Sequence, residues 1–327
     1  MRKVKAVMSG NINSLYYRNT EKHKCRLAYN RSRIYRVDSG CYMATVCYGL
    51  GVACYNKGDY EMAVAYFTKA TKLNPRFAKA FFHRGLSYGK KGQQYRAIVD
   101  FSSAIAIKPD DYKAYYNRGI GYSKIEMVNR AKLDFDKAIE LAPAYAEAYF
   151  SRGDLYIFKK EVDMAIIDYD KAIMLNPDYA LAYYHRGITY YEKGETDAAI
   201  IDYNKAIELK PNHADFYCNL GAVYGIKGNY EQATINFTKA IELNPNSAID
   251  YLNLASAYTM VNDYNNAVSN YTKAIELDSF LQEAYVGRGH GYLSNGDKNR
   301  AVADFKVAAQ LGHSEAQKIL CDNDCQY

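Results

Sequence analysis

The chain has 327 residues, of which 49% are hydrophobic and 24% charged, a composition ordinary for a soluble globular protein and unlike that of a disordered chain. It contains no run of 18 apolar residues, so we expect no transmembrane helix. The formal charge of +6 is concentrated at the N-terminus, where residues 1–43 carry ten Lys and Arg against two acidic residues.

Residues 1–43 are predicted to form a basic, flexible N-terminal arm that also carries aromatic residues such as Tyr16, Tyr17 and Tyr35. The arm lacks the continuous apolar core of a secretory signal, and its acid-poor composition also fits an organellar transit segment. We therefore expect a cytoplasmic location, with an organellar one as the alternative. Contact of the arm with nucleic acid, a membrane or an acidic protein stays open.

The seven cysteines are an odd number and include no CxxC motif. Free thiols in a reducing compartment are therefore expected. Cys321 and Cys325 are four residues apart and could pair on oxidation, or bind a metal with ligands from elsewhere. Because the histidines form no HxxxH or HExxH pattern, we expect neither a metal nor another cofactor.

From residue 44 onward the chain repeats itself every 34 residues. All six prolines obey this period: Pro75, Pro109, Pro143, Pro177, Pro211 and Pro245. Two alanine columns obey it as well, one running from Ala63 to Ala301 and the other from Ala70 to Ala308. Such self-similarity predicts a solenoid of small helical units. Eight repeats follow without insertion, starting at residues 44, 78, 112, 146, 180, 214, 248 and 282, and ending at 315.

Each repeat is predicted to be two short amphipathic helices joined by a tight turn. We number the places within a repeat from 1 to 34. The fourth place is usually aromatic and the eighth is small, which lets two helices approach closely. The turn usually contains a glycine, which tolerates a left-handed backbone. Glu126 and Lys160 occupy that glycine position in the third and fourth repeats, where we expect local strain.

These columns resemble the tetratricopeptide repeat (TPR) over residues 44–315, although Tyr or Phe stands at the fourth place where the family usually has Trp. The resemblance implies an all-α, right-handed superhelical solenoid whose first helices line a concave face used for binding proteins. Residues 309–317 resemble a Sel1-type repeat junction. We expect residues 315–322 to form a short helix that covers the open end of the solenoid, so that 316–327 are a capping helix and tail.

A coupled pair of residues varies between repeats. The seventh place is Arg in five repeats, and the twenty-third is Asp in the same five, giving Arg84/Asp100, Arg118/Asp134, Arg152/Asp168, Arg186/Asp202 and Arg288/Asp304. The other three repeats carry Leu at the seventh place and no Asp at the twenty-third. We therefore predict an Arg–Asp bridge between the two helices of one repeat. Binding of an anionic ligand by these arginines is the alternative.

By resemblance, the second, fifth, sixth, ninth, twelfth and thirteenth places face the concave groove. The fifth place is aromatic in the first five repeats, at Tyr48, Phe82, Tyr116, Phe150 and Tyr184. These rings would anchor a bound peptide, or instead be buried between neighbouring repeats. The sixth place carries a mixed polar ladder suited to a peptide backbone, at His83, Asn117, Ser151, His185, Asn219 and Asn253.

Charge along the presumed groove is graded. The second and third repeats offer Lys79, Lys90, Lys113 and Lys124, whereas later repeats offer Glu147, Asp154, Glu192, Asp215 and Glu283. A ligand with an acidic end near the lysines would be steered by this field, although a solvated charged rim explains it equally well.

Taken together, these features predict a non-catalytic scaffold that binds another protein or an extended peptide and no small-molecule substrate. The alternatives are a targeting or regulatory subunit of an enzyme complex and a self-associating structural solenoid, so a homo-oligomer is one expected state. The repeats leave no residues for a catalytic domain, and no nucleophile motif occurs among the serines.

Overall fold

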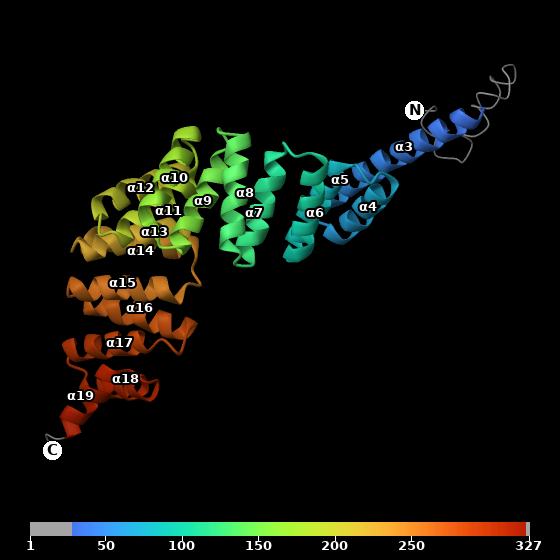
Figure 1. Ribbon diagram of the computed structural model, residues 1–327. Coiled ribbons are helices and arrows are strands. Elements are labelled where there is room, and N and C mark those ends of the chain that lie inside the picture. Colours follow the sequence, from blue (N-terminus) through green and yellow to red (C-terminus); the bar gives the residue numbers. More distant parts are fainter. Residues whose placement is uncertain (1–27, 325–327) are drawn as a thin grey trace, which may run out of the picture. The chain divides into compact units, whose positions relative to one another are not determined.

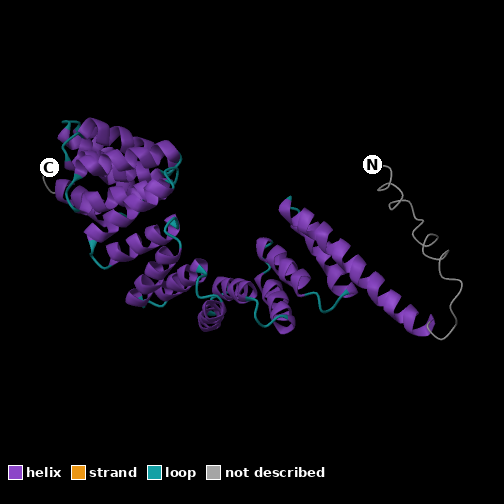
Figure 2. Cartoon of the chain, turned by 90° about the horizontal axis from the view of Figure 1, so that it is seen from above, coloured by secondary structure: helices purple, strands orange, loops and turns teal. Residues whose placement is uncertain are grey.

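The computed structural model describes residues 28–324, with side chains from residue 40 to residue 320. Within that range all regular secondary structure is α-helical, and loops connect the helices (Figure 2). Most of the predicted arm, residues 1–27, lies outside the described residues, as do the side chains of Cys321 and Cys325. The four cysteines whose side chains are described, Cys41, Cys47, Cys54 and Cys218, are free thiols.

The chain divides into two compact units, residues 1–137 (unit 1) and residues 138–327 (unit 2), and the division falls within α8 (Val128–Leu141). Unit 1 contains α3 (Ala28–Asn56), α4 (Tyr60–Leu73), α5 (Ala78–Lys90), α6 (Gln94–Ile107), α7 (Tyr112–Lys124) and the start of α8. Unit 2 contains the end of α8 together with α9 (Ala146–Phe158), α10 (Val162–Leu175), α11 (Ala180–Glu192), α12 (Thr196–Leu209), α13 (Ala214–Ile226), α14 (Tyr230–Leu243), α15 (Ala248–Met260), α16 (Tyr264–Leu277), α17 (Gln282–Ser294), α18 (Lys298–Gln310) and α19 (Ser314–Asp324).

Within each unit, successive helices form the predicted pairs. In unit 2 the first helix of a repeat packs against its second helix, and the second helix packs against the first helix of the next repeat (Figure 1). Each contact therefore joins elements close in sequence, as expected of a solenoid. The all-α solenoid predicted from the 34-residue period is confirmed.

The repeat columns form the core. The alanines of both columns are almost completely buried, and so is the aromatic ring between them, as with Phe67, Phe135 and Tyr169. The glycine at the eighth place makes room for that ring, because a Cβ atom on Gly153 would lie 2.7 Å from the ring of Tyr169. A methyl group at this place would force the two helices of the repeat apart.

The turns within repeats use the left-handed backbone region. Gly58 and Gly194 have φ of 81° and 82°, and the non-glycine residues Glu126, Lys160 and Asn262 have φ of 59°, 61° and 62°. The strain expected at Glu126 and Lys160 is therefore present, because a residue with a Cβ atom adopts this conformation at a cost.

The two ends of the array differ in how far the helices extend. Helix α3 begins at Ala28 and runs without a break into the first repeat, so residues 28–43, which were assigned to the arm, are helical. The repeat columns indicate only which residues pack, so they do not predict where a helix begins. Residues 28–43 contain no proline that would break the helix. At the other end, α19 packs Ala316, Ile319 and Leu320 against the last repeat. The Sel1-type junction at this end stays a prediction.

Candidate functional site

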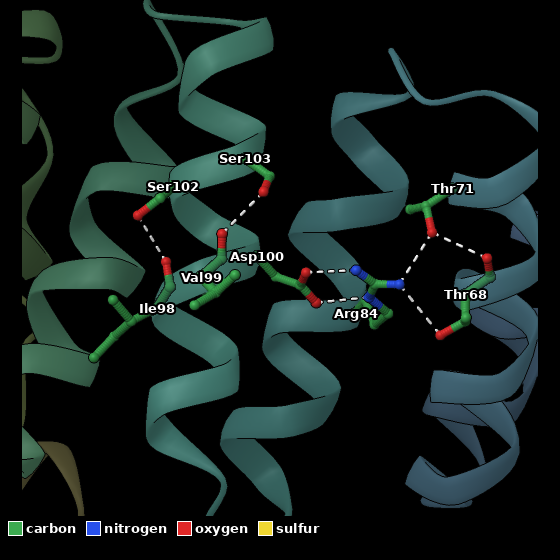
Figure 3. Close-up of polar contacts among 8 residues, drawn as sticks. All are labelled: Thr68, Thr71, Arg84, Ile98, Val99, Asp100, Ser102 and Ser103. Carbon is green, nitrogen blue, oxygen red and sulfur yellow. Dashed lines mark hydrogen bonds and ion pairs between the residues drawn. The ribbon is translucent and has the colours of Figure 1, made fainter.

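The five Arg–Asp pairs are bidentate salt bridges between the two helices of one repeat. In every pair the arginine Nε and Nη2 donate to the two carboxylate oxygens over 2.6–2.8 Å. Figure 3 shows the pair formed by Arg84 of α5 and Asp100 of α6. Its hydrogen bonds raise the pKa of Arg84, whereas burial raises the pKa of Asp100.

The aspartates of these pairs belong to the core and not to an accessible site. Asp134 of α8 accepts both of its hydrogen bonds from Arg118, and Asp168 of α10 accepts both of its own from Arg152. Asp134 and Asp168 are only 5% and 3% exposed, and Asp100, Asp202 and Asp304 are buried to the same degree. From the sequence, these carboxylates were expected to form structural ion pairs within each repeat, and each of them is held in such a pair. The pairs join the two helices of a repeat.

The same guanidinium also reaches the second helix of the preceding repeat. Arg84 Nη1 donates to Thr68 Oγ1 over 3.2 Å and to Thr71 Oγ1 over 3.0 Å (Figure 3). Arg118 and Arg288 bind Ser102 and Thr272 in the same way, each over 3.1 Å. Because all three nitrogens of each of these guanidinium groups are engaged, the geometry supports a structural role over the anion-binding alternative.

The fifth-place aromatics are half-buried. Each packs on the second-helix aromatic of its own repeat, with ring centroids 5.7–6.0 Å apart in the pairs Tyr48–Phe67, Phe82–Phe101, Tyr116–Phe135, Phe150–Tyr169 and Tyr184–Tyr203. Such separations are typical of aromatic pairs in protein cores. Three of the rings also contact an aromatic ring at the junction with the next repeat, in the pairs Tyr48–Phe77, Phe150–Tyr179 and Tyr184–Phe216, so more than one side of these rings is used within the fold.

The sixth-place polar ladder is partly used within the protein. Asn219 Nδ2 donates to Tyr184 Oη over 2.8 Å, and His83 Nδ1 lies 3.4 Å from Tyr48 Oη. In both cases the sixth place of one repeat meets the fifth place of the preceding one. Asn253 Nδ2 lies 3.9 Å from Cys218 Sγ in the same relation. A ligand backbone would therefore find only the remaining donors and acceptors of these side chains.

The remaining groove residues lie on the first helices as predicted. Asn117 Nδ2 donates to the backbone oxygen of Lys113 over 2.8 Å, which is a contact within one helix turn. Ser151 is half-buried on α9. The two lysines assigned to the groove, Lys79 and Lys113, are both exposed on the first helices of unit 1. Of this set only the lysines present an exposed charged side chain.

In unit 2, Asp154, Tyr169 and His185 form a hydrogen-bonded cluster that joins the fourth repeat to the fifth. Asp154 Oδ1 accepts a hydrogen bond from Tyr169 Oη over 2.8 Å and lies 2.8 Å from His185 Nδ1. Burial and the negative charge of Asp154 together raise the pKa of Tyr169. From the sequence, Asp154 was expected only as part of a charge gradient. The signal for the cluster was the hydroxyl of Tyr169, which stands where the first three repeats have Phe.

An apolar cavity of about 300 Å³ lies between α13 and α15. Tyr230 and Phe237 of α14 contribute aromatic surface to its walls. The first helices contribute Ala222, Gly225, Ile226, Asn253, Ser256 and Met260. These first-helix residues occupy the sixth, ninth, twelfth and thirteenth places, four of those assigned to one face by resemblance. Ile226 and Met260 are 63% and 56% exposed, so large apolar side chains border the cavity. This cavity was not predicted from the sequence.

A larger hollow of about 500 Å³ lies beside the salt bridge of Arg186 and Asp202, among Tyr183, Ile201, Lys205 and Glu208. Its walls come mostly from the second helix α12, and its charged groups are already joined to one another or to neighbours. We therefore regard the smaller cavity, which is apolar and borders exposed aliphatic residues, as the better binding feature.

Membrane spans and metal sites can be assessed for the described part of the chain alone. No helix there is long and apolar enough to cross a membrane. Among the same residues, no group of three or more His, Cys, Asp or Glu side chains could hold a metal ion.

Comparison with known families places this architecture. Three profiles described as tetratricopeptide repeat match the chain. The first matches residues 44–77 and 214–247, the second 78–111 and 112–145, and the third 236–269. A profile described as TPR repeat matches residues 153–194 and 189–225. An uncharacterized protein of Methanocaldococcus jannaschii is 41% identical over 51 residues, which are 16% of this chain and 59% of that protein.

Solved structures with the same fold include the C-terminal part of a TPR repeat-containing protein from Cytophaga hutchinsonii. It has a TM-score of 0.61 and 24% identity, covering 72% of this chain and 98% of that one. PilF of Pseudomonas aeruginosa has a TM-score of 0.57 and 22% identity, covering 66% and 100%. YrrB, described as a TPR protein with an unusual peptide-binding site, has a TM-score of 0.53 and 23% identity, covering 58% and 97%. At these identities the likeness is one of fold alone.

Proposed function

Because the chain belongs to the tetratricopeptide repeat family, a family of protein-interaction scaffolds, we propose that it binds an extended protein segment on the first helices of unit 2. The observation that carries this proposal is the apolar cavity between α13 and α15 with exposed Ile226 and Met260 at its border. Exposed aliphatic side chains around a concave site favour burial against a partner.

The first-helix surface of unit 2 also offers polar groups for orienting such a segment. Asp154 and His185 are partly exposed, with 40% and 35% of their side chains accessible. Asn253, which lines the cavity, retains its carbonyl oxygen as an acceptor beside apolar surface. An apolar cavity with few polar groups at its edge is the usual composition of a specific binding site.

A second exposed surface provides a matched control. The twenty-second place, on the second helices, is aliphatic in five consecutive repeats, at Val99, Leu133, Ile167, Ile201 and Ile235, and all five are more than half exposed. Of these five residues only Ile201 borders one of the two hollows described above, so Ile201 is left out of the control. Ile167 and Ile235, which are 58% and 54% exposed, match Ile226 and Met260 in size and exposure.

The test compares two double variants in the full-length chain. Ile226→Lys with Met260→Lys should abolish capture of partner proteins from the native cell, whereas Ile167→Lys with Ile235→Lys should leave it unchanged. Thermal melts of both variants check that each remains folded. Equal capture by the wild type and the Ile226→Lys/Met260→Lys variant would refute this surface as the binding site.

A further inference from the structure

We propose that the first-helix surface of unit 2 binds the basic segment 1–27 of a second copy of this chain. This inference rests on the function proposed above, because it names the segment that the surface takes. It accounts for a charge asymmetry that packing within the repeats does not require.

The first helices of unit 2 are acidic. Helices α9, α11, α13, α15 and α17 contain no lysine, and their accessible carboxylates are Glu147, Asp154, Glu192, Asp215 and Glu283, whereas Asp250 is buried. Their only arginines, Arg152, Arg186 and Arg288, are each held by a buried aspartate of the second helix. The negative charge on this surface is therefore not offset by cations of the same helices.

The first helices of unit 1 have the opposite charge. Helices α5 and α7 contain Lys79, Lys90, Lys113 and Lys124 and no acidic residue. A basic segment would be repelled by these helices and attracted by those of unit 2. Electrostatics thus selects one of the two surfaces, and it acts within about 10 Å at ordinary salt concentrations.

The segment itself matches the surface of unit 2 in two respects. Residues 1–27 contain seven Lys and Arg and a single acidic residue, Glu21. Close to the first basic residues stand Val4, Val7 and Met8, which are aliphatic side chains suited to the apolar cavity beside Ile226 and Met260. A basic and aliphatic segment complements an acidic surface that contains an apolar cavity.

A second copy is the occupant we infer because each copy carries both the basic segment and the acidic surface. The lysines of α5 and α7 repel the segment, whereas the carboxylates on the first helices of unit 2 attract it. The segment of one copy can therefore bind unit 2 of another, which makes association depend on protein concentration.

Sedimentation velocity tests the inference in full-length variants whose charges are reversed on the segment, on the surface, or on both. Self-association should weaken by about tenfold or more when Arg2, Lys3 and Lys5 are replaced by Glu, and equally when Glu192, Asp215 and Glu283 are replaced by Lys. Combining the two sets should restore association, because opposite charges again face one another. Replacing Glu208, Glu242 and Glu276 by Lys makes the same charge change on the second helices and should have no effect.

A labelled peptide of residues 1–27 supplies a direct measurement. It should bind the wild-type chain more weakly as salt rises, and it should not bind the Glu192→Lys/Asp215→Lys/Glu283→Lys variant. A chain that stays monomeric at every concentration would overturn the inference, whether or not the peptide binds. So would association that the combined charge exchange does not restore. If Ile226→Lys/Met260→Lys still abolishes partner capture in either case, the proposed function stands without this inference.

Discussion

Arg288 of α17 and Asp304 of α18 are joined by two charge-assisted hydrogen bonds of 2.8 Å each. The Asp304 side chain is only 8% accessible and that of Arg288 15%. Removing one partner of such a pair lowers the free energy of unfolding strongly, because the other charge stays buried without a partner. Replacing both partners by apolar residues is well tolerated.

Arg288→Leu alone should destabilise the last repeat by about 3 kcal/mol, because Asp304 would keep its buried charge without a partner. Arg288→Leu combined with Asp304→Asn should cost far less, since the sixth repeat carries Leu220 and Asn236 at these places. Hydrogen exchange of the α18 amides measures local unfolding of this repeat. Equal acceleration in both variants would contradict the role given to the pair.

Gly153→Ala should destabilise the fourth repeat by about 1–3 kcal/mol, because the new methyl carbon would lie 2.7 Å from the Tyr169 ring. Gly225→Ala is the matched control within a first helix. Its Cβ atom would lie 4.0 Å from the nearest neighbour, Ala233 Cβ, so its effect should be neutral or slightly stabilising. Urea denaturation of both variants checks this, and similar losses would contradict the packing argument.

Lys160→Gly should stabilise the turn between α9 and α10 by up to about 1 kcal/mol, because Lys160 has φ of 61° and glycine adopts this region without a Cβ clash. Gly194→Lys, at the same place of the next repeat, should destabilise by a similar amount, since Gly194 has φ of 82°. Thermal melts measure both changes. A destabilised Lys160→Gly variant would mean that the lysine side chain contributes more than the backbone strain costs.

Stability above pH 10 should depend on Tyr184. Burial raises the pKa of Tyr184 to about 12, above the value of 10.0 for an exposed tyrosine. The folded state therefore keeps a proton that the unfolded state loses, so this stabilising contribution is complete below pH 10 and disappears as the pH rises toward 12. Tyr184→Phe should lose less stability than the wild type between pH 9 and pH 11, by up to about 1 kcal/mol.

Unfolding by urea at each pH measures that difference, and the absorbance of phenolate at alkaline pH reports the ionisation itself. Because Tyr184 is only partly buried, solvent screening keeps the effect modest. Parallel pH profiles for the two proteins would rule out Tyr184 as a source of alkaline instability.

Much of the fold was predictable because each repeat packs within itself and against its neighbours. The glycine at the eighth place and the aromatic ring on the second helix report one contact, as with Gly153 and Tyr169, and they recur at a fixed separation. The joint presence of Arg288 and Asp304 was readable for the same reason. The start of α3 at Ala28 was not, because residues 28–43 lie outside the repeat columns.

The candidate surface was less predictable. Asn219 was expected to face a ligand, but its amide donates to Tyr184 of the preceding repeat. This contact joins residues 35 positions apart and depends on how the repeats stack. The cavity beside Ile226 and Met260 likewise arises where small residues from two different repeats meet.

The sequence alone determined the architecture of this protein: a helical array with a 34-residue period, stop signals at the prolines and an Arg–Asp bond within five of the repeats. These features depend on contacts within one repeat, and such contacts recur in the sequence at a fixed spacing. The tertiary structure alone decided which polar groups are already used and where apolar surface remains open, because both depend on contacts between repeats. The hydrogen bond from Asn219 to Tyr184 and the cavity between α13 and α15 are of this second kind.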